Sequence, residues 1–122
     1  PSILREEVSE WFERDDDSPY MNVVMNFKEE KKSKVPAVVH RDGTARIQTV
    51  TEKDNKWYYS FLKKWKDKSG VPIVLNTSFN DREPICETPQ HAINCFLGTD
   101  IDFLYFYDYN ILLNKTEESE EE

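Results

Sequence analysis

Residues 70–89 read GVPIVLNTSFNDREPICETP, and the rest of the fold is arranged around this stretch. Its apolar part, residues 71–75, is short and rich in β-branched side chains, which predicts a buried strand rather than a helix. A polar cluster follows at residues 76–80. Thr88 and Pro89 are typical of a helix start, with threonine as the N-cap and proline at the first helical position. The stretch therefore predicts a strand, a polar loop and a helix, in that order.

The loop at residues 76–80 carries small hydroxyl and amide side chains directly after the predicted strand. Side chains of this kind at the end of a buried strand are well placed to bind a ligand. The same residue types also form turns by hydrogen bonding to their own backbone. A plain turn is therefore the alternative interpretation of this loop.

Hydrophobic periodicity predicts both helices and strands along the rest of the chain. The predicted helices span residues 5–14, 55–68 and 89–97. The predicted strands span residues 20–27, 35–40, 44–51, 71–75, 103–107 and 111–113. We expect residues 44–50 and 71–75 to lie in one sheet. Because helices and strands mix irregularly, the expected fold class is α/β (α+β), with a mixed twisted sheet.

Two of these segments carry more specific expectations. Arg41, Asp42 and Gly43 are a turn signal, which predicts a hairpin between residues 35–40 and 44–51. The helix at residues 55–68 can begin at an Asp54 or Asn55 cap and end at Gly70. Its apolar stripe is interpreted as part of the core and consists of Trp57, Phe61, Leu62 and Trp65.

The composition predicts one domain at residues 1–115 and a disordered acidic tail at residues 116–122. The tail glutamates account for much of the net charge of −8, so the rest is nearly neutral and we expect no nucleic-acid partner. No apolar run is long enough to cross a membrane, so no membrane partner is expected. Cys86 and Cys95 form no CxxC motif, which favours reduced thiols, a cytoplasmic location and no metal site in this chain.

Two sequence blocks carry a resemblance to a known family. The first is LNTSFN at residues 75–80, followed by EPI at residues 83–85 and TP at residues 88–89. The second is HRDGTARIQTV at residues 40–50. Their order and separation resemble the C-terminal signatures of the O-carbamoyltransferases of the nodulation and antibiotic-tailoring type. Weaker matches lie at residues 1–4, 18–21 and 101–115.

The resemblance implies a YrdC-like domain, an open twisted mixed sheet with packed helices and a ligand groove. It implies that this domain uses carbamoyl phosphate and ATP, with Mg, to form carbamoyl adenylate. In the family, an N-terminal actin-like domain holding iron or another metal passes the carbamoyl group to a hydroxyl of a small-molecule or saccharide acceptor. That domain is absent here, and Pro1 lies at the edge of a basic family stretch. We therefore expect the native start to be missing and the isolated fragment to be inactive.

The resemblance also assigns site residues. Arg46 is the arginine of the GTAR element and is expected to hold a phosphate, because a guanidinium binds two phosphate oxygens at once. Ser78 and Asn80 match the family's S-x-N element, whose hydroxyl and amide can bind phosphate oxygens and the carbamoyl group. We assign the catalytic role to Arg46 and Ser78. A surface ion pair is the alternative role for Arg46.

Three further residues complete the expected binding site. Asn76 precedes Ser78 by two residues and is expected on the same side of the chain, and Thr77 lies between them. His40 matches the histidine of the family's H-x-D-G-T pattern, although a hydrogen-bonded structural histidine is the alternative. We expect Arg46, Asn76, Ser78 and Asn80 to face one groove.

Two other functions remain open at the level of sequence. The chain could be a non-catalytic nucleotide-binding module that keeps the YrdC-like fold. It could also be an RNA-binding YrdC-like domain, because some relatives of that fold serve tRNA modification. The nearly neutral charge of residues 1–115 weighs against RNA binding.

Overall fold

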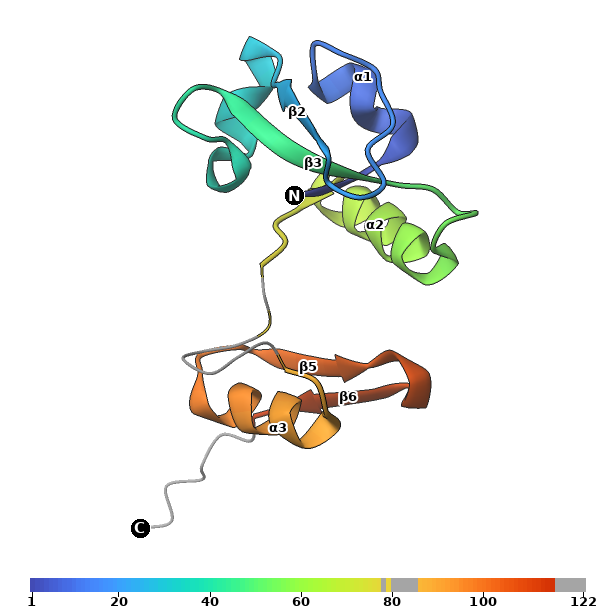
Figure 1. The fold of residues 1–122 in the computed structure, drawn as a ribbon, viewed down its shortest axis with the longest axis vertical. Coiled ribbons are helices and arrows are strands. Elements are labelled where there is room, and N and C mark those ends of the chain that lie inside the picture. Colours follow the sequence, from blue (N-terminus) through green and yellow to red (C-terminus); the bar gives the residue numbers. More distant parts are fainter. Residues whose placement is uncertain (78, 80–85, 116–122) are drawn as a thin grey trace. The chain divides into compact units, whose positions relative to one another are not determined.

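The computed structural model describes residues 1–77, 79 and 86–115. The chain divides into two compact units, Pro1–Asn76 and Thr77–Glu122, which are described separately here (Figure 1). The single domain expected at residues 1–115 therefore stays a prediction. The tail at residues 116–122 lies outside the described residues.

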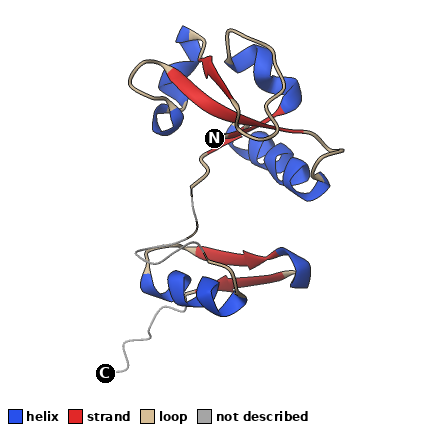
Figure 2. Cartoon of the chain, viewed as in Figure 1, coloured by secondary structure: helices blue, strands red, loops and turns tan. Residues whose placement is uncertain are grey.

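The second unit contains α3 and a two-stranded antiparallel sheet (Figure 2). Its elements are α3 (Pro89–Gly98), β5 (Phe103–Phe106) and β6 (Ile111–Asn114). The N-cap prediction is confirmed, because the Thr88 hydroxyl accepts a hydrogen bond of 3.1 Å from the His91 backbone N–H. The helix packs its buried Ala92 and Phe96 against Leu104 of the sheet.

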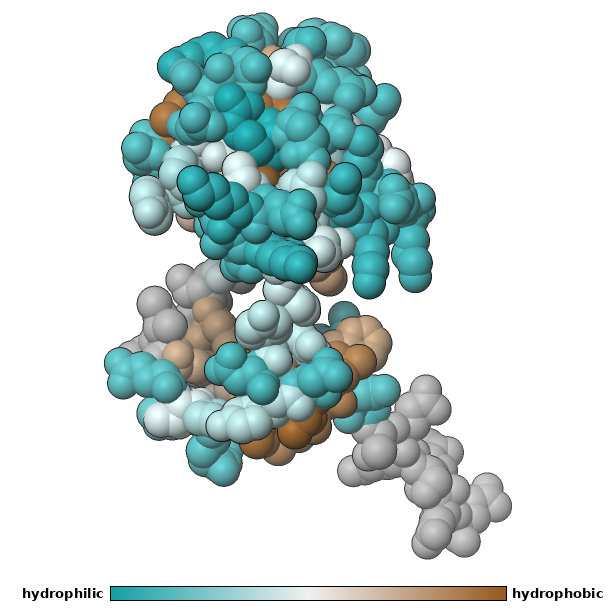
Figure 3. Space-filling model, turned by 90° about the vertical axis from the view of Figure 1, so that its right-hand side faces the viewer, coloured by the Kyte–Doolittle hydropathy of each residue, from teal (hydrophilic) through white to brown (hydrophobic). Residues whose placement is uncertain are grey.

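Other large apolar side chains of this unit are exposed, among them Leu97, Phe103 and Leu112. Figure 3 shows hydrophobic residues gathered at the surface of this unit. The reason is the pairing of β5 with β6, since alternate side chains of a two-stranded sheet point away from the helix that covers its other face. Leu104 and its partner Leu113 face α3, so their neighbours Phe103 and Leu112 point away from it.

The first unit is built on a four-stranded mixed sheet in the order β2-β3-β1-β4. Its strands are β1 (Ser2–Leu4), β2 (Val23–Asn26), β3 (Thr44–Val50) and β4 (Ile73–Val74). β1 runs parallel to β3, whereas the β1–β4 and β2–β3 pairs are antiparallel. The mixed sheet confirms the predicted fold class, and β3 and β4 lie in one sheet as expected.

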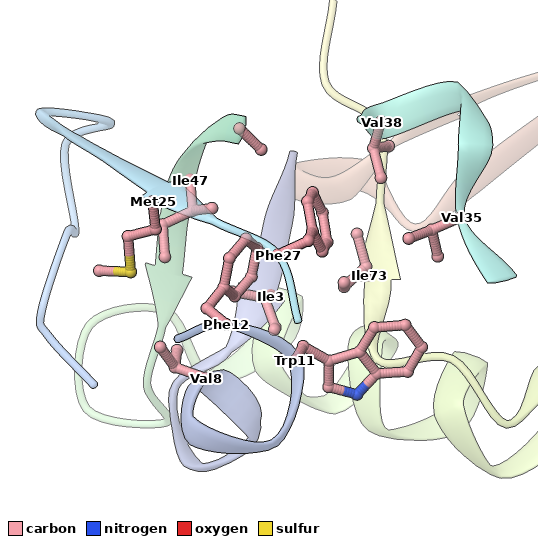
Figure 4. Packing of buried hydrophobic residues seen from close by; sticks show 11 residues of the cluster. Ile3, Val8, Trp11, Phe12, Met25, Phe27, Val35, Val38, Ile47 and Ile73 are labelled. Atoms are coloured by element: carbon pink, nitrogen blue, oxygen red, sulfur yellow. The ribbon is translucent and has the colours of Figure 1, made fainter. Parts of the chain in front are cut away.

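Each face of this sheet has its own hydrophobic cluster. On one face, Ile3, Ile47 and Ile73 pack against the short helix α1 (Val8–Trp11) and the residues that follow it. Figure 4 shows the Phe12 and Phe27 rings in contact at the centre of this cluster, with ring centroids 4.3 Å apart. On the other face, Leu4 and Val50 pack against Leu62 of α2 (Lys56–Ser69). Alternation along β3 thus separates the two faces.

Both ends of α2 confirm the sequence prediction of a cap at Asp54 or Asn55 and an end at Gly70. The Asn55 side chain accepts a hydrogen bond of 3.1 Å from the Tyr58 backbone N–H. Gly70 ends the helix with a φ of 76°, the left-handed conformation that favours glycine.

The apolar stripe of α2 is not core, contrary to the sequence interpretation. Trp57, Phe61 and Trp65 are 38%, 44% and 43% exposed, and only Leu62 of the stripe is buried. Leu62 follows Phe61 by one residue, which turns its side chain by roughly 100° around the helix axis. The helix presents the Leu62 side to the sheet, so the aromatic row lies at the edge of this contact.

Two element predictions before β3 are also wrong in part. Residues 35–40 form no strand but contain a 3₁₀ helix, Pro36–Val38, so the predicted hairpin is absent and β3 pairs with β1 and β2 instead. Proline cannot donate to a strand ladder, and Val35 and Val38, three residues apart, both point into the core. The helix predicted at residues 5–14 begins as the 3₁₀ turn Arg5–Glu7 and ends at Trp11, because Phe12 is extended.

Candidate functional site

A half-buried polar cluster joins three strands beneath α2. The Asn76 amide, two residues after β4, donates hydrogen bonds of 2.6 Å to Ser2 Oγ and 3.1 Å to Gln48 Oε1. The Ser2 hydroxyl also donates to Gln48 Oε1, at 3.0 Å. Ser2 stands opposite both Gln48 of β3 and Val74 of β4 in the sheet register. The loop that leaves β4 is therefore tied to β1 and β3 through side chains.

Tyr58 joins this cluster from α2. Its hydroxyl donates a hydrogen bond of 3.2 Å to Asn76 Oδ1. Burial raises the pKa of Tyr58 above the ordinary tyrosine value, and a hydrogen bond with Ser2 opposes this shift in part. The phenol therefore stays protonated and remains a donor at neutral pH.

A pocket of about 260 Å³ adjoins the cluster and shares Gln48 and Tyr58 with it. Its other lining residues include Tyr20, Thr49, Asp54 and Asn55. Tyr20 is 86% exposed, so its ring is accessible from solvent. The lining combines two phenol rings with amide, hydroxyl and carboxylate groups, which together can contact a polar ligand that has a flat or apolar part.

The wall of this pocket at Pro19 and Tyr20 is positioned by Ser18, which is fully buried. The Ser18 hydroxyl donates to the Ile47 carbonyl at 2.8 Å and accepts from the Val23 N–H at 3.2 Å. Its backbone N–H donates to Thr49 Oγ1 at 2.9 Å. One small polar residue thus fixes this loop to β2 and β3.

Arg46 lies on the same face of β3 as Gln48. The two residues are separated by one position, and the residue between them, Ile47, is buried in the opposite cluster. Arg46 is exposed and stands beside Val24 of β2. Among the described residues it makes no ion pair. Its guanidinium is available on the face that carries the polar cluster.

His40 lies away from this cluster, in the turn before β3. Its side chain is exposed, and its backbone N–H donates to the Thr44 carbonyl at 2.9 Å. In the same turn, Asp42 Oδ1 accepts hydrogen bonds from the Thr44 hydroxyl and N–H, which lower the pKa of Asp42. Asp42 and Gly43 are the turn residues that the sequence indicates.

The structure brings together only part of the predicted site. Asn76 and Arg46 share one face of the sheet in the first unit, as described above. Thr77 is exposed at the start of the second unit, whereas Ser78 and Asn80 lie outside the described residues. The common groove for Arg46, Asn76, Ser78 and Asn80 therefore stays a prediction.

Sequence reasoning missed several residues of this region, namely Ser2, Tyr20, Gln48 and Tyr58. A signal existed for Gln48, because it follows Arg46 by two residues on a predicted strand and so shares its face. Tyr58 carries no comparable signal. Its role depends on how α2 is rotated against the sheet, which the helical pattern did not reveal.

A family model described as carbamoyltransferase C-terminus matches residues 1–113 of this chain. The chain belongs to this family. It is 43% identical over 115 residues to nodulation protein NolNO of Sinorhizobium fredii, a match that covers 91% of this chain and 17% of that protein. It is 44% identical over 108 residues to nodulation protein NolO of Bradyrhizobium diazoefficiens, with 85% of this chain and 20% of that protein covered.

An uncharacterised protein of Methanocaldococcus jannaschii is also similar, with 43% identity over 110 residues that cover 89% of this chain and 18% of that protein. This carbamoyltransferase-family chain thus spans less than a quarter of the length of these relatives. Its described helices include none with the length and apolarity needed to cross a membrane. Within the described part of the chain, no three His, Cys, Asp or Glu side chains gather as possible metal ligands.

Proposed function

We propose that this chain is the part of an O-carbamoyltransferase that binds ATP and carbamoyl phosphate and forms carbamoyl adenylate. One observation carries the proposal: the polar cluster around Asn76 ties the LNTSFN block to β3, the strand that carries Arg46 of the other family block. Phosphate groups need cationic and neutral donors that converge from more than one segment. Arg46 provides a cationic donor, and the cluster anchors the start of the LNTSFN loop on the same face of the sheet.

Each described residue has a defined role in this proposal. The Arg46 guanidinium binds phosphate oxygens of ATP or carbamoyl phosphate. The pocket of about 260 Å³ lies below the range of roughly 300–1,000 Å³ that is typical for a whole small ligand, so it would hold one part of a nucleotide. Tyr58, Gln48 and Ser2 hold Asn76 in place rather than contact the reacting atoms. Thr77, Ser78, Asn80 and His40 are further proposed ligands.

Chemical balance defines what the reaction must release. Forming carbamoyl adenylate from carbamoyl phosphate and ATP consumes one water and releases one phosphate and one pyrophosphate. Mg bound to ATP supplies positive charge at the phosphates. We further propose that another part of a longer cytoplasmic protein, an N-terminal actin-like domain holding iron or another metal, transfers the carbamoyl group to the acceptor hydroxyl.

Amide resonances of this chain, followed during titration with ATP·Mg and then carbamoyl phosphate, test the binding proposal. We expect the largest shifts at Arg46, Gln48 and Asn76, because these residues share one face of the sheet. The exposed turn residue Arg41 serves as the internal control and should shift little. The absence of saturable shifts on this face would contradict the proposal.

Release of phosphate and pyrophosphate by a longer protein that contains this chain tests the chemistry. Both products should appear only when carbamoyl phosphate and ATP are supplied together. A nucleotide-binding module without catalysis would bind ATP but release neither product.

A further inference from the structure

The exposed aromatic row of α2 is an apolar feature of the first unit that the proposed function leaves unused. Trp57, Phe61 and Trp65 are each more than a third exposed. The Trp57 and Phe61 rings are stacked, with centroids 5.7 Å apart and an interplanar angle of 12°. Aromatic side chains in such rows are the common anchors of protein interfaces, because each buries a large area on association.

Trp65 stands between two apolar hollows. One has a volume of about 410 Å³ and is lined by Phe61, Lys64, Trp65, Asp67 and Lys68. The other has a volume of about 360 Å³, and its lining includes Val35, Pro36, Trp65 and Leu75. The Trp65 indole N–H donates a hydrogen bond of 3.2 Å to the Ile73 carbonyl, which holds the ring in place as the wall between the two hollows.

The rim of these hollows is basic. Lys64 and Lys68 are exposed, one helical turn apart, beside the first hollow, and Lys34 is exposed beside the second. None of these three lysines forms an ion pair within the part of the chain that the structure describes. Asp67 is the only carboxylate among the described residues that line either hollow. This rim is positive on a chain whose net charge is −8.

We propose that the α2 surface, formed by Phe61, Lys64, Trp65 and Lys68 with the two hollows, docks an acidic segment of a separate protein. Two apolar side chains of the segment enter the hollows on either side of Trp65. Carboxylates beside these anchors pair with Lys64, Lys68 and Lys34. The residues that line the first hollow are not among those that line the pocket at Gln48 and Tyr58, although the Phe61 and Tyr58 rings are stacked with centroids 6.4 Å apart.

Charge and shape favour this occupant over two others. A second copy of the chain would bring Lys64 and Lys68 of both copies into one interface, where like charges repel. Single-stranded nucleic acid could stack on the aromatic rings, but it needs a continuous basic groove for its phosphates. Here the hollows between the lysines are apolar, and Asp67 lines one of them.

Three synthetic peptides of about 18 residues, five helical turns, test the proposal. Each carries leucine and phenylalanine anchors on one side, and the flanking positions are all glutamate, all glutamine or all lysine. Binding is measured by anisotropy of a labelled peptide, and the Trp65 indole N–H resonance reports the location. We expect the glutamate peptide to bind at least about tenfold more tightly than the glutamine peptide and to shift the Trp65 signal.

Reversing the charges of Lys64 and Lys68 tests whether these lysines pair with the carboxylates of the peptide. The Lys64→Glu/Lys68→Glu variant should no longer prefer the glutamate peptide, and we expect it to bind the lysine peptide instead. The matched control is Lys53→Glu/Lys56→Glu, two exposed lysines that line neither hollow, which should keep the original preference. Phe61→Ser, measured with the same peptides, should weaken binding of all of them while the fold, followed by circular dichroism, is kept.

Several outcomes would overturn the proposal. They are equal binding of the glutamate and glutamine peptides, an unchanged preference after reversal of Lys64 and Lys68, or no binding of any peptide. Tighter binding of a single-stranded oligonucleotide to the same residues would assign the surface to nucleic acid. Self-association that Phe61→Ser abolishes would assign it to a second copy.

Discussion

The Asn76 side chain donates a hydrogen bond of 3.1 Å to Gln48, a residue 28 positions earlier in the chain. This contact links the end of β4 to β3, although β1 lies between the two strands in the sheet. Ser2 of β1 bridges them by bonding to both side chains. The loop that resembles the family signature is thereby anchored where it leaves the sheet.

Replacement of Asn76 by alanine is expected to lower the free energy of unfolding by about 1–3 kcal/mol, because it leaves polar partners in a half-buried site without their donor. Chemical denaturation of the chain measures this loss. Asn22→Ala is the control, since the exposed Asn22 side chain accepts one long hydrogen bond of 3.3 Å from the Ser18 hydroxyl among the described residues, and its loss should change stability little. Equal effects of the two changes would show that the cluster contributes nothing specific.

Tyr58→Phe should lower the free energy of unfolding by less than Asn76→Ala does, about 0.5–1.5 kcal/mol, because it removes one neutral hydrogen bond and keeps the ring. The raised pKa of Tyr58 also predicts a pH dependence. Its contribution to stability is complete below the ordinary tyrosine pKa of 10.0 and is lost as pH rises through the folded-state value. Ultraviolet titration of both proteins should show that the missing phenol ionises above pH 10.0.

The helix caps and most strands of this fold can be predicted because they depend on local sequence, but the strand β1 (Ser2–Leu4) is not among the predicted strands. The β-branched run of β3, the Thr88 cap and the glycine at position 70 each specify a conformation through nearby residues. The strand predicted at residues 35–40 is wrong, and the reason also lies in the local sequence. Its apolar residues suit a strand, but Pro36 and the three-residue spacing of Val35 and Val38 favour a 3₁₀ turn.

Only part of the candidate site can be predicted from the sequence, because the site depends on how the helices and strands pack. Asn76 was predicted to contribute, and it does join a polar cluster, but the partners Ser2 and Tyr58 come from distant segments. The aromatic stripe of α2 shows the same limit. A helical pattern identifies an apolar side, whereas the sheet determines which part of that side is covered.

Adjacent residues of α2 should therefore respond very differently to mutation. Leu62→Ala is expected to lower the free energy of unfolding by about 2–5 kcal/mol, because Leu62 is fully buried against Leu4 and Val50. Phe61→Ser should cost about 1 kcal/mol or less, because Phe61 is 44% exposed. Denaturant unfolding of both variants measures the difference. A larger loss for Phe61→Ser than for Leu62→Ala would contradict the observed rotation of α2.

Gly70 offers a test of the helix end. A methyl group added at Gly70 meets no atom within 4 Å, so the cost of Gly70→Ala comes from its φ of 76° alone. We expect a loss of about 1–2 kcal/mol in unfolding free energy. Gly98→Ala is the matched control, because Gly98 also has open space around it but no positive φ, and it should be neutral or stabilising.

Arg46 provides the most direct functional prediction. Arg46→Ala should weaken ATP·Mg or carbamoyl phosphate binding by about 1.5–3 kcal/mol, because it removes a charge-assisted contact with a phosphate. The affinity of Arg46→Lys should lie between those of the wild-type and Arg46→Ala chains, since lysine keeps the charge but loses the planar fork that binds two oxygens. Because Arg46 is exposed, neither change should alter the unfolding free energy by more than about 0.5 kcal/mol.

Calorimetric titration of the wild-type and variant chains measures these affinities, and Arg41→Ala serves as the control for loss of an exposed arginine outside the site. Raising the salt concentration should reduce wild-type affinity more than that of Arg46→Ala, because the variant has lost a charged contact that salt screens. Unchanged affinity in a folded Arg46→Ala protein would remove Arg46 from the site. The polar cluster around Asn76 would then be the remaining candidate for ligand binding.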